Sequence, residues 1–113
     1  MNKKQYTFII FYLNLISCAI IVLIGAGMNV MAVATNDGKM PVLVAGYSYE
    51  DNTHKLVNSK EEINSFYLAD IISVGDLYFS IGDILIVCGC VGTFALVFNQ
   101  SIKYYREKRQ EIK

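Results

Sequence analysis

The stretch TFIIFYLNLISCAIIVLIGAGMNVMAVA, residues 7–34, contains no charged side chain over 28 residues. A second apolar run, residues 84–98, is free of charge over 15 residues and directly follows Asp83. A helix needs about 20 predominantly apolar residues to cross the hydrocarbon core of a bilayer. The two runs therefore predict an all-α membrane protein, a two-span transmembrane helical hairpin.

Charges and turn residues divide the chain into five segments. A soluble domain would interrupt its apolar residues every few positions, whereas here the 54% of hydrophobic residues are concentrated in two blocks. We expect, in chain order, a cytoplasmic N-terminus over 1–6, a first transmembrane helix over 7–35, an extracytoplasmic segment over 36–79, a second transmembrane helix over 80–101, and a basic cytoplasmic tail over 102–113.

The basic residues are distributed unevenly, although the formal net charge is zero. The segment between the two runs is mostly acidic, and Lys and Arg are concentrated near the two termini. Because Lys and Arg near span ends stay on the cytoplasmic side, the pattern predicts a multi-pass cell membrane protein with both termini cytoplasmic. The tail is expected to lie on anionic lipid, and no other feature supports nucleic-acid binding. Its membrane-surface residues are Lys103, Arg106, Lys108 and Arg109.

Cys18 leaves two interpretations of the first run open. Leu15-Ile16-Ser17-Cys18 has the form of a bacterial lipobox, in which the cysteine is lipidated and becomes the new N-terminus. The residues after Cys18 stay apolar, however, where a mature lipoprotein turns polar, and this favours an uncleaved span. Intact-mass measurement of the membrane-extracted protein distinguishes the two.

Small and amide residues in the two runs predict where the helices pack. Gly82 and Gly89 are one heptad apart and therefore share a helix face. In lipid, helices associate where small residues let backbones approach and where polar side chains find partners. We expect the second span to pack on the first, on a second copy or on a foreign helix. The predicted helix-packing residues are Gly25, Asn29, Gly82, Gly89 and Gly92.

The segment between the runs begins and ends with turn and capping signals. Asn36 and Gly38 belong to an Asn-Asp-Gly turn, and Pro41 biases Met40 toward an extended backbone. At the other end, the Ser80 hydroxyl and the Asp83 carboxylate can each accept a hydrogen bond from the backbone amide of the other residue, which caps the start of the second span. Gly82 lies between them. A further capping pattern, Ser59-Lys60-Glu61-Glu62, predicts a short amphipathic helix over about 60–72.

Carboxyl groups are the remaining candidates for chemistry. Asp70, Asp76 and Asp83 are expected near the outer membrane surface, where such acids serve as caps and turn acceptors or bind a cation. The sequence contains no nucleophile–base arrangement, phosphate loop or metal-ligand spacing. It therefore predicts no enzyme activity, no cofactor and no resident metal.

Three stretches resemble a known family. They are NDGKMPV at 36–42, Leu68-Ala69-Asp70, and FSIGD at 79–83. Together they resemble the C-terminal half of an uncharacterised family of bacterial multi-pass membrane proteins, which shows N-G-G-R-M-P-V, then L-G-D, then S-x-G-D. The resemblance covers about residues 25–95, and the glycines expected at two positions are Asp37 and Ala69 here. Family members usually have additional preceding spans, and no activity is established for them, so the resemblance implies architecture more than function.

Three functions fit a hairpin of this kind. The first is a structural or accessory subunit of a larger membrane complex, docking through its small-residue helix faces onto a membrane-protein partner or another copy. The second is a regulatory or immunity-type protein that binds a channel, transporter or sensor. The third is an oligomeric pore or carrier, which is disfavoured because Asn14, Ser17 and Asn29 do not form a full polar stripe.

Overall fold

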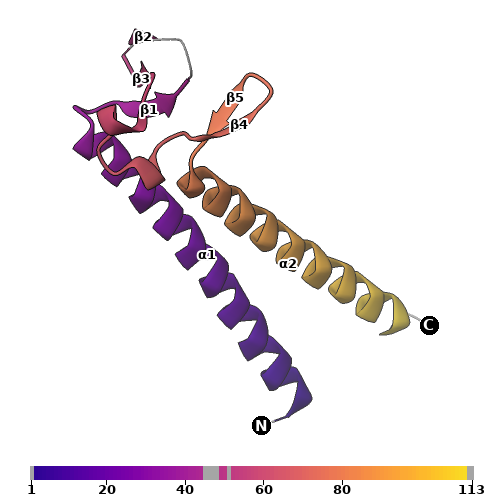
Figure 1. Ribbon diagram of the computed structural model, residues 1–113. Helices are drawn as coiled ribbons and strands as arrows, with labels where there is room; N and C mark the ends of the chain where they lie inside the picture. The colour runs from indigo at the N-terminus through magenta and orange to yellow at the C-terminus, as the bar shows by residue number, and fades with distance from the viewer. Residues whose placement is uncertain (1, 45–48, 51, 112–113) are drawn as a thin grey trace.

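The computed structural model describes residues 2–44, 49–50 and 52–111 of the chain. It is an elongated helical hairpin, 67 × 29 × 19 Å, with a small folded region at the end where the helices meet (Figure 1). The helices are α1 (Lys3–Thr35) and α2 (Ile81–Glu111). We call the intervening region, residues 36–79, the head. Its elements are β1 (Met40–Leu43), β2 (Tyr49–Glu50), β3 (His54–Val57), the 3-10 turns η1 (Lys60–Glu62) and η2 (Phe66–Leu68), β4 (Ile72–Val74) and β5 (Leu77–Phe79).

Both helices are long and apolar enough to cross a membrane. In their most apolar windows only 6% of the α1 residues and 11% of the α2 residues are buried. The core helix of a soluble protein would bury such residues, because exposing them to water is unfavourable. The apolar side chains of the hairpin therefore suit a lipid environment.

The helices are longer than the two apolar runs. The Asn2 side chain accepts a hydrogen bond from the Gln5 amide, and the Gln5 side chain accepts one from the Asn2 amide, so α1 begins at Lys3. This reciprocal cap satisfies amide groups that have no partner within the helix. At the other end of the chain, α2 continues past position 101 without a break and includes the basic residues as far as Arg109.

The head is not helical, so the predicted all-α class is wrong for this region. β1 pairs in parallel with β3, and β2 pairs with β3 in the antiparallel direction. β4 and β5 form a separate antiparallel hairpin whose two-residue turn has Gly75 at φ +62°. These strands are two to four residues long. They are too short to produce a clear alternating pattern in the sequence.

The single helix predicted over about 60–72 is also wrong. The segment forms the turns η1 and η2, and between them Ser65 adopts a left-handed backbone with φ 55°. The Ser59 hydroxyl bonds the Glu62 carboxylate at 3.2 Å and does not cap a backbone amide. Ile63 and Ala69 of this segment instead pack with Val57 of β3 in a small core.

Candidate functional site at the junction of the helices and the head

The two helices touch backbone to backbone at the end nearest the head. A Cβ atom added at Gly25 would lie 2.5 Å from the Gly82 carbonyl oxygen, and one added at Gly82 would lie 2.6 Å from the Gly25 carbonyl oxygen. Both distances are shorter than any real Cβ contact, and a backbone atom cannot rotate away as a side chain can. The close approach therefore requires glycine at both positions.

Gly89 and Gly92 continue this contact along α2. A Cβ at Gly89 would lie 2.5 Å from Val22 Cγ2 and 2.9 Å from the Cys18 carbonyl oxygen, and one at Gly92 would lie 2.9 Å from Cys18 Sγ. Four of the predicted helix-packing residues thus lie between α1 and α2 of the same chain. We refer to these four as the glycine contact: Gly25, Gly82, Gly89 and Gly92.

A polar cluster of Asn29, Ser80 and Asp83 closes the same end of the hairpin. The Ser80 amide donates to Asp83 Oδ2 at 3.0 Å and the Asp83 amide donates to Ser80 Oγ at 3.0 Å, which is the reciprocal cap of α2. Asn29 of α1 joins this cap through its amide, donating to Asp83 Oδ1 at 2.6 Å and accepting from Ser80 Oγ at 2.8 Å. The cap of one helix is therefore also its attachment to the other.

Asn36 attaches the head to the end of α1. Its side-chain amide donates to the carbonyl oxygens of Ala32 and Asn64, each at 2.7 Å, and its Oδ1 accepts from the Asn64 amide at 2.8 Å. The Asn64 side chain returns a hydrogen bond to the Thr35 carbonyl at 3.0 Å. Asn36 is only 5% exposed, so these bonds satisfy a polar group that burial would otherwise penalise.

The exit turn places β1 directly above the helix pair. Asp37 and Gly38 follow Asn36 with φ of 57° and 79°, which reverses the chain after α1. Met40 is then buried and its amide donates to the Thr53 carbonyl at 2.9 Å. Pro41 is also buried, and its carbonyl accepts from the Asp70 amide at 3.0 Å.

Asp70 is the buried acid of the junction. It is 6% exposed, and its Oδ1 has no hydrogen-bond partner among the described residues. Burial, and secondarily the charge of Asp83, raises the pKa of the Asp70 carboxyl to about 6, although His54 opposes the shift. Asp76, by contrast, lies exposed in the β4–β5 turn.

A cation site of three carboxylates is not formed. The described residues contain no group of three His, Cys, Asp or Glu side chains that could hold a metal ion. The charge of Asp83 acts on Asp70, whereas Asp76 lies exposed in the β4–β5 turn.

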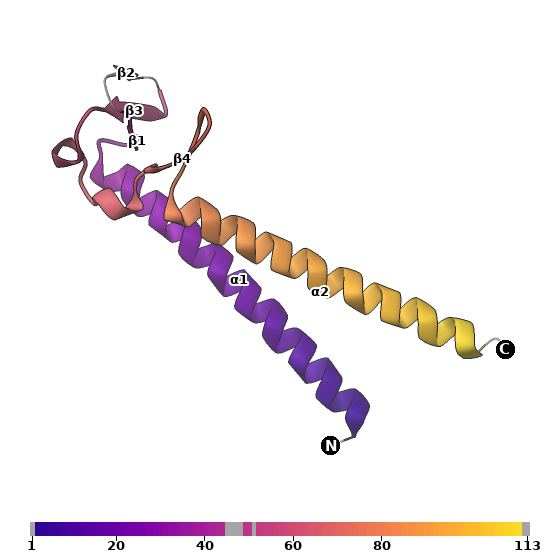
Figure 2. The ribbon, with the colours of Figure 1, turned by 45° about the vertical axis from the view of Figure 1, so that its right-hand side comes forward.

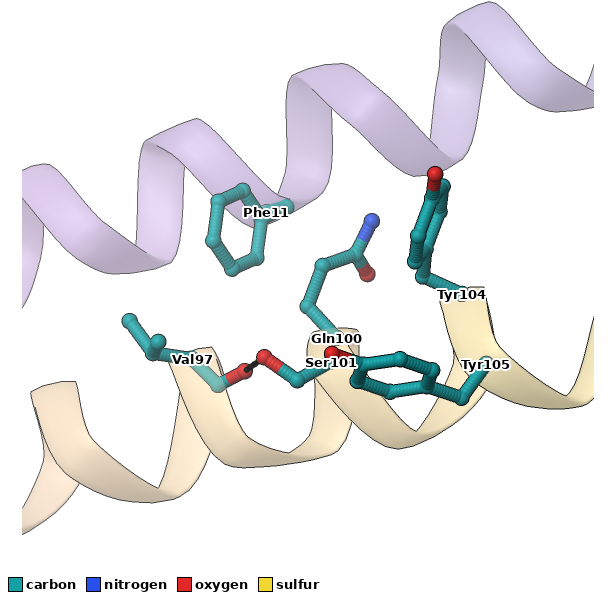
Figure 3. A pocket seen from close by; sticks show the side chains of 6 residues that line it. All are labelled: Phe11, Val97, Gln100, Ser101, Tyr104 and Tyr105. Atoms are coloured by element: carbon teal, nitrogen blue, oxygen red, sulfur yellow. Dashed lines mark hydrogen bonds between the residues drawn. The ribbon is translucent and has the colours of Figure 1, made fainter.

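The helices diverge toward the two termini, as both ribbon views show (Figures 1 and 2). At this end an open cavity of about 350 Å³ lies between them. Phe11 of α1 faces Gln100 and Tyr104 of α2 across it (Figure 3). The predicted membrane-surface residues are all exposed on the adjoining turns of α2: Lys103, Arg106, Lys108 and Arg109.

Two parts of the junction were not found by sequence reasoning. Asn64 carried no signal, because a single asparagine within a helix-like pattern has no distinctive spacing. The burial of Asp70 depends on the parallel bridge between Val42 and Asp70, which joins residues far apart in the sequence. Its only signal was the pair of motifs around Pro41 and Asp70, which are in contact here.

Comparison with known proteins gives one finding. A family model described as a family of unknown function (DUF5317) matches residues 5–98, which include the whole head and the apolar part of both helices. Neither curated proteins nor solved structures gave a match. The match is consistent with the resemblance to an uncharacterised family.

Proposed function

The chain belongs to the DUF5317 family of unknown function, and we propose that it is a structural or accessory subunit of a larger membrane complex. In this proposal α1 and α2 both span the cell membrane, the two termini are cytoplasmic and the head is extracytoplasmic. The exposed apolar helices and the basic α2 end support this placement, since Lys and Arg are retained on the cytoplasmic side.

The observation that carries the proposal is a second, unused face of α1. Gly25 points to α2, whereas a Cβ at Gly27 would meet no described atom within 4 Å. Ile20, Leu23 and Met31 share the helix face of Gly27, since they are seven, four and four residues away, and all are exposed. A small residue between large apolar ones forms a notch in which another helix can pack closely. We call it the Gly27 face.

The internal glycine contact changes which surface is available for docking. The glycine contact, whose residues were predicted to pack against another helix, already joins α1 and α2 within the hairpin. The Gly27 face of α1 remains open. The attachment of the head through Asn36 and Asn64 gives a partner a preorganised surface on the outer side as well. Preorganisation lowers the entropy cost of association.

Co-purification of the full-length chain tests the subunit role. The tagged protein is extracted from its native membrane in a mild detergent, and its associated chains are identified by mass spectrometry. We expect a constant partner with the native chain and its loss with Gly27→Leu, which fills the notch. Val91→Leu on α2 is the control, because Val91 is also exposed, on the other helix.

A monomer without any associated chain in the native preparation contradicts the subunit role. Fusions of a fluorescent protein and of alkaline phosphatase to the C-terminus test the topology separately. The fluorescent protein is fluorescent in the cytoplasm, whereas the phosphatase is active only outside the membrane. Phosphatase activity of the C-terminal fusion would contradict the cytoplasmic placement.

The regulatory alternative is favoured by one specific observation, the buried Asp70 Oδ1, which has no hydrogen-bond partner among the described residues. A carboxyl group that loses its proton near neutral pH lets a regulatory protein bind its target in response to pH. In that case a channel, transporter or sensor co-purifies with the chain under some conditions only, whereas a subunit co-purifies under all.

A further inference from the structure

We propose that the Asp70 carboxyl group is a proton-binding site that controls the attachment of the head to the helix pair. The neutral acid keeps the head docked, and loss of its proton loosens the junction. The inference concerns the fold of this chain and does not depend on the identity of any partner.

Burial makes the charged form of Asp70 costly. Asp70 is only 6% exposed, and its Oδ1 has no hydrogen-bond partner among the described residues. An ionised carboxylate can accept about four hydrogen bonds and is strongly hydrated in water. Without replacement bonds the ionised form loses that hydration, whereas the neutral acid loses much less.

Backbone hydrogen bonds hold Asp70 against β1. Its amide donates to the Pro41 carbonyl at 3.0 Å, and its carbonyl accepts from the Leu43 amide at 3.2 Å. These bonds form the parallel bridge to Val42 in β1. Separation of the Asp70 segment from β1 would expose the buried carboxyl oxygen to water, so ionisation favours opening of the junction.

Charges on two packed elements act on this group. Asp83 at the start of α2 disfavours the ionised form, and His54 of β3 favours it. The Ser80 amide and the Asn29 side chain hold the Asp83 carboxylate in place, so it cannot easily turn away. β1 has no ionisable side chain over its four residues. The charged residues closest to β1 in the sequence are Asp37 and Lys39, and Lys55 lies in the neighbouring strand β3.

The direction of the pH effect follows from these contributions. The pKa of Asp70 rises from 3.8 in a solvated chain to about 6 in the folded chain. The folded junction therefore binds the proton more tightly than the open one does. Its full stability is present below the lower pKa, and it is lost as pH rises through about 6.

Hydrogen–deuterium exchange of the full chain in detergent micelles tests the proposal. Peptides that contain Leu43 and Asp70 are followed at pH 5 and pH 7.5, with rates corrected for intrinsic exchange. We expect protection of these amides to fall by about 10-fold between these pH values, because part of the effect of a pKa shift from 3.8 to about 6 is already lost at pH 5. Protection in the middle of α1 and α2 should not change.

Three variants separate proton binding from a general pH effect. Asp70→Asn keeps the shape and removes the charge, so protection should be high at both pH values. Asp76→Asn, at an exposed carboxyl, should behave as the native chain does. Should Asp70→Asn fail to fold, Asp83→Asn supplies a second measurement, because removing its charge should move the transition to lower pH.

Two results would overturn the proposal. One is equal protection of the native chain at both pH values. The other is a pH-dependent loss of protection that persists in Asp70→Asn. At pH 7.5, protection should be the same in sodium buffer, in choline buffer and after addition of calcium. Higher protection in the presence of sodium or calcium would instead identify the site as one for a metal cation.

Discussion

The two ends of the helix pair differ in how their residues meet. Near the head, Gly25 and Gly82 bring the backbones into contact, and Asn29 bonds across to Asp83. Near the termini, Phe11 and Tyr104 face one another across an open cavity. Both ends contain apolar and polar side chains, so hydrophobicity alone does not explain which end is closed.

The difference shows what holds helices together where the surroundings are apolar. In lipid the hydrophobic effect does not favour helix–helix contact over helix–lipid contact, so close packing and interhelical hydrogen bonds decide. The head end has both, because its side chains are small or carry amide and carboxylate groups. The terminal end has large aromatic side chains, which prevent the backbones from approaching.

Filling the glycine contact should have the largest effect. Gly25→Leu places a side chain against the Gly82 carbonyl and should destabilise the hairpin by about 3 kcal/mol or more, the upper range for overpacking. Gly27→Leu, two residues along the same helix, should leave hairpin stability within about 0.5 kcal/mol. Unfolding by added SDS in mixed micelles measures both, and equal curves would contradict the packing face.

Removing the Asn36 side chain should release the head and spare the helix pair. Asn36→Ala leaves the Asn64 amide and the carbonyl of the buried Ala32 without these bonds, a loss of about 2 kcal/mol. Limited proteolysis should then cut within the head faster, while SDS unfolding of α1 and α2 shifts little. Unchanged cleavage of the head would show that Asn36 is not its main attachment.

Removing the interhelical amide should have a smaller effect at the closed end. Asn29→Ala breaks the bonds to Asp83 and Ser80 and leaves their reciprocal cap intact, so we expect a loss of about 1 kcal/mol. Asn14→Ala is the matched control on an exposed part of the same helix. SDS unfolding that ranks Asn14→Ala as the more damaging change would contradict the polar cluster.

The smallest effect is expected at the open end. Phe11→Ala enlarges an existing cavity and should change stability by less than about 0.5 kcal/mol. Ile86→Ala, beside Gly25 at the closed end, should cost more, because Ile86 packs in close contact there. Similar losses for both in the SDS assay would mean that the two ends pack equally well.

The hairpin could be predicted from the sequence, whereas most of the head could not. Charge-free runs indicated both apolar helices, and the heptad spacing of Gly82 and Gly89 indicated a shared face. Such features are local or periodic. The head depends on strands too short to have a period and on the left-handed Ser65, which interrupts an otherwise helical pattern.

The candidate site divides in the same way. Ser80 and Asp83 are three residues apart, so their reciprocal bonds could be anticipated from spacing. Asn36 and Asn64 are 28 residues apart, and the environment of Asp70 depends on its bridge to β1. Burial created by non-local pairing cannot be derived from neighbouring residues.

The unbroken length of α2 turns the hairpin into a mechanical lever. The helix runs 31 residues from the junction, or about 46 Å at 1.5 Å per residue. The glycine contact with α1 ends at Gly92, and about 28 Å of α2 extends beyond it to Glu111. A tilt of about 10° at that point would carry the far end through about 5 Å, by the same rise per residue. A small change of angle where the helices separate is therefore amplified into a displacement of the basic tip that is large on the scale of a side chain.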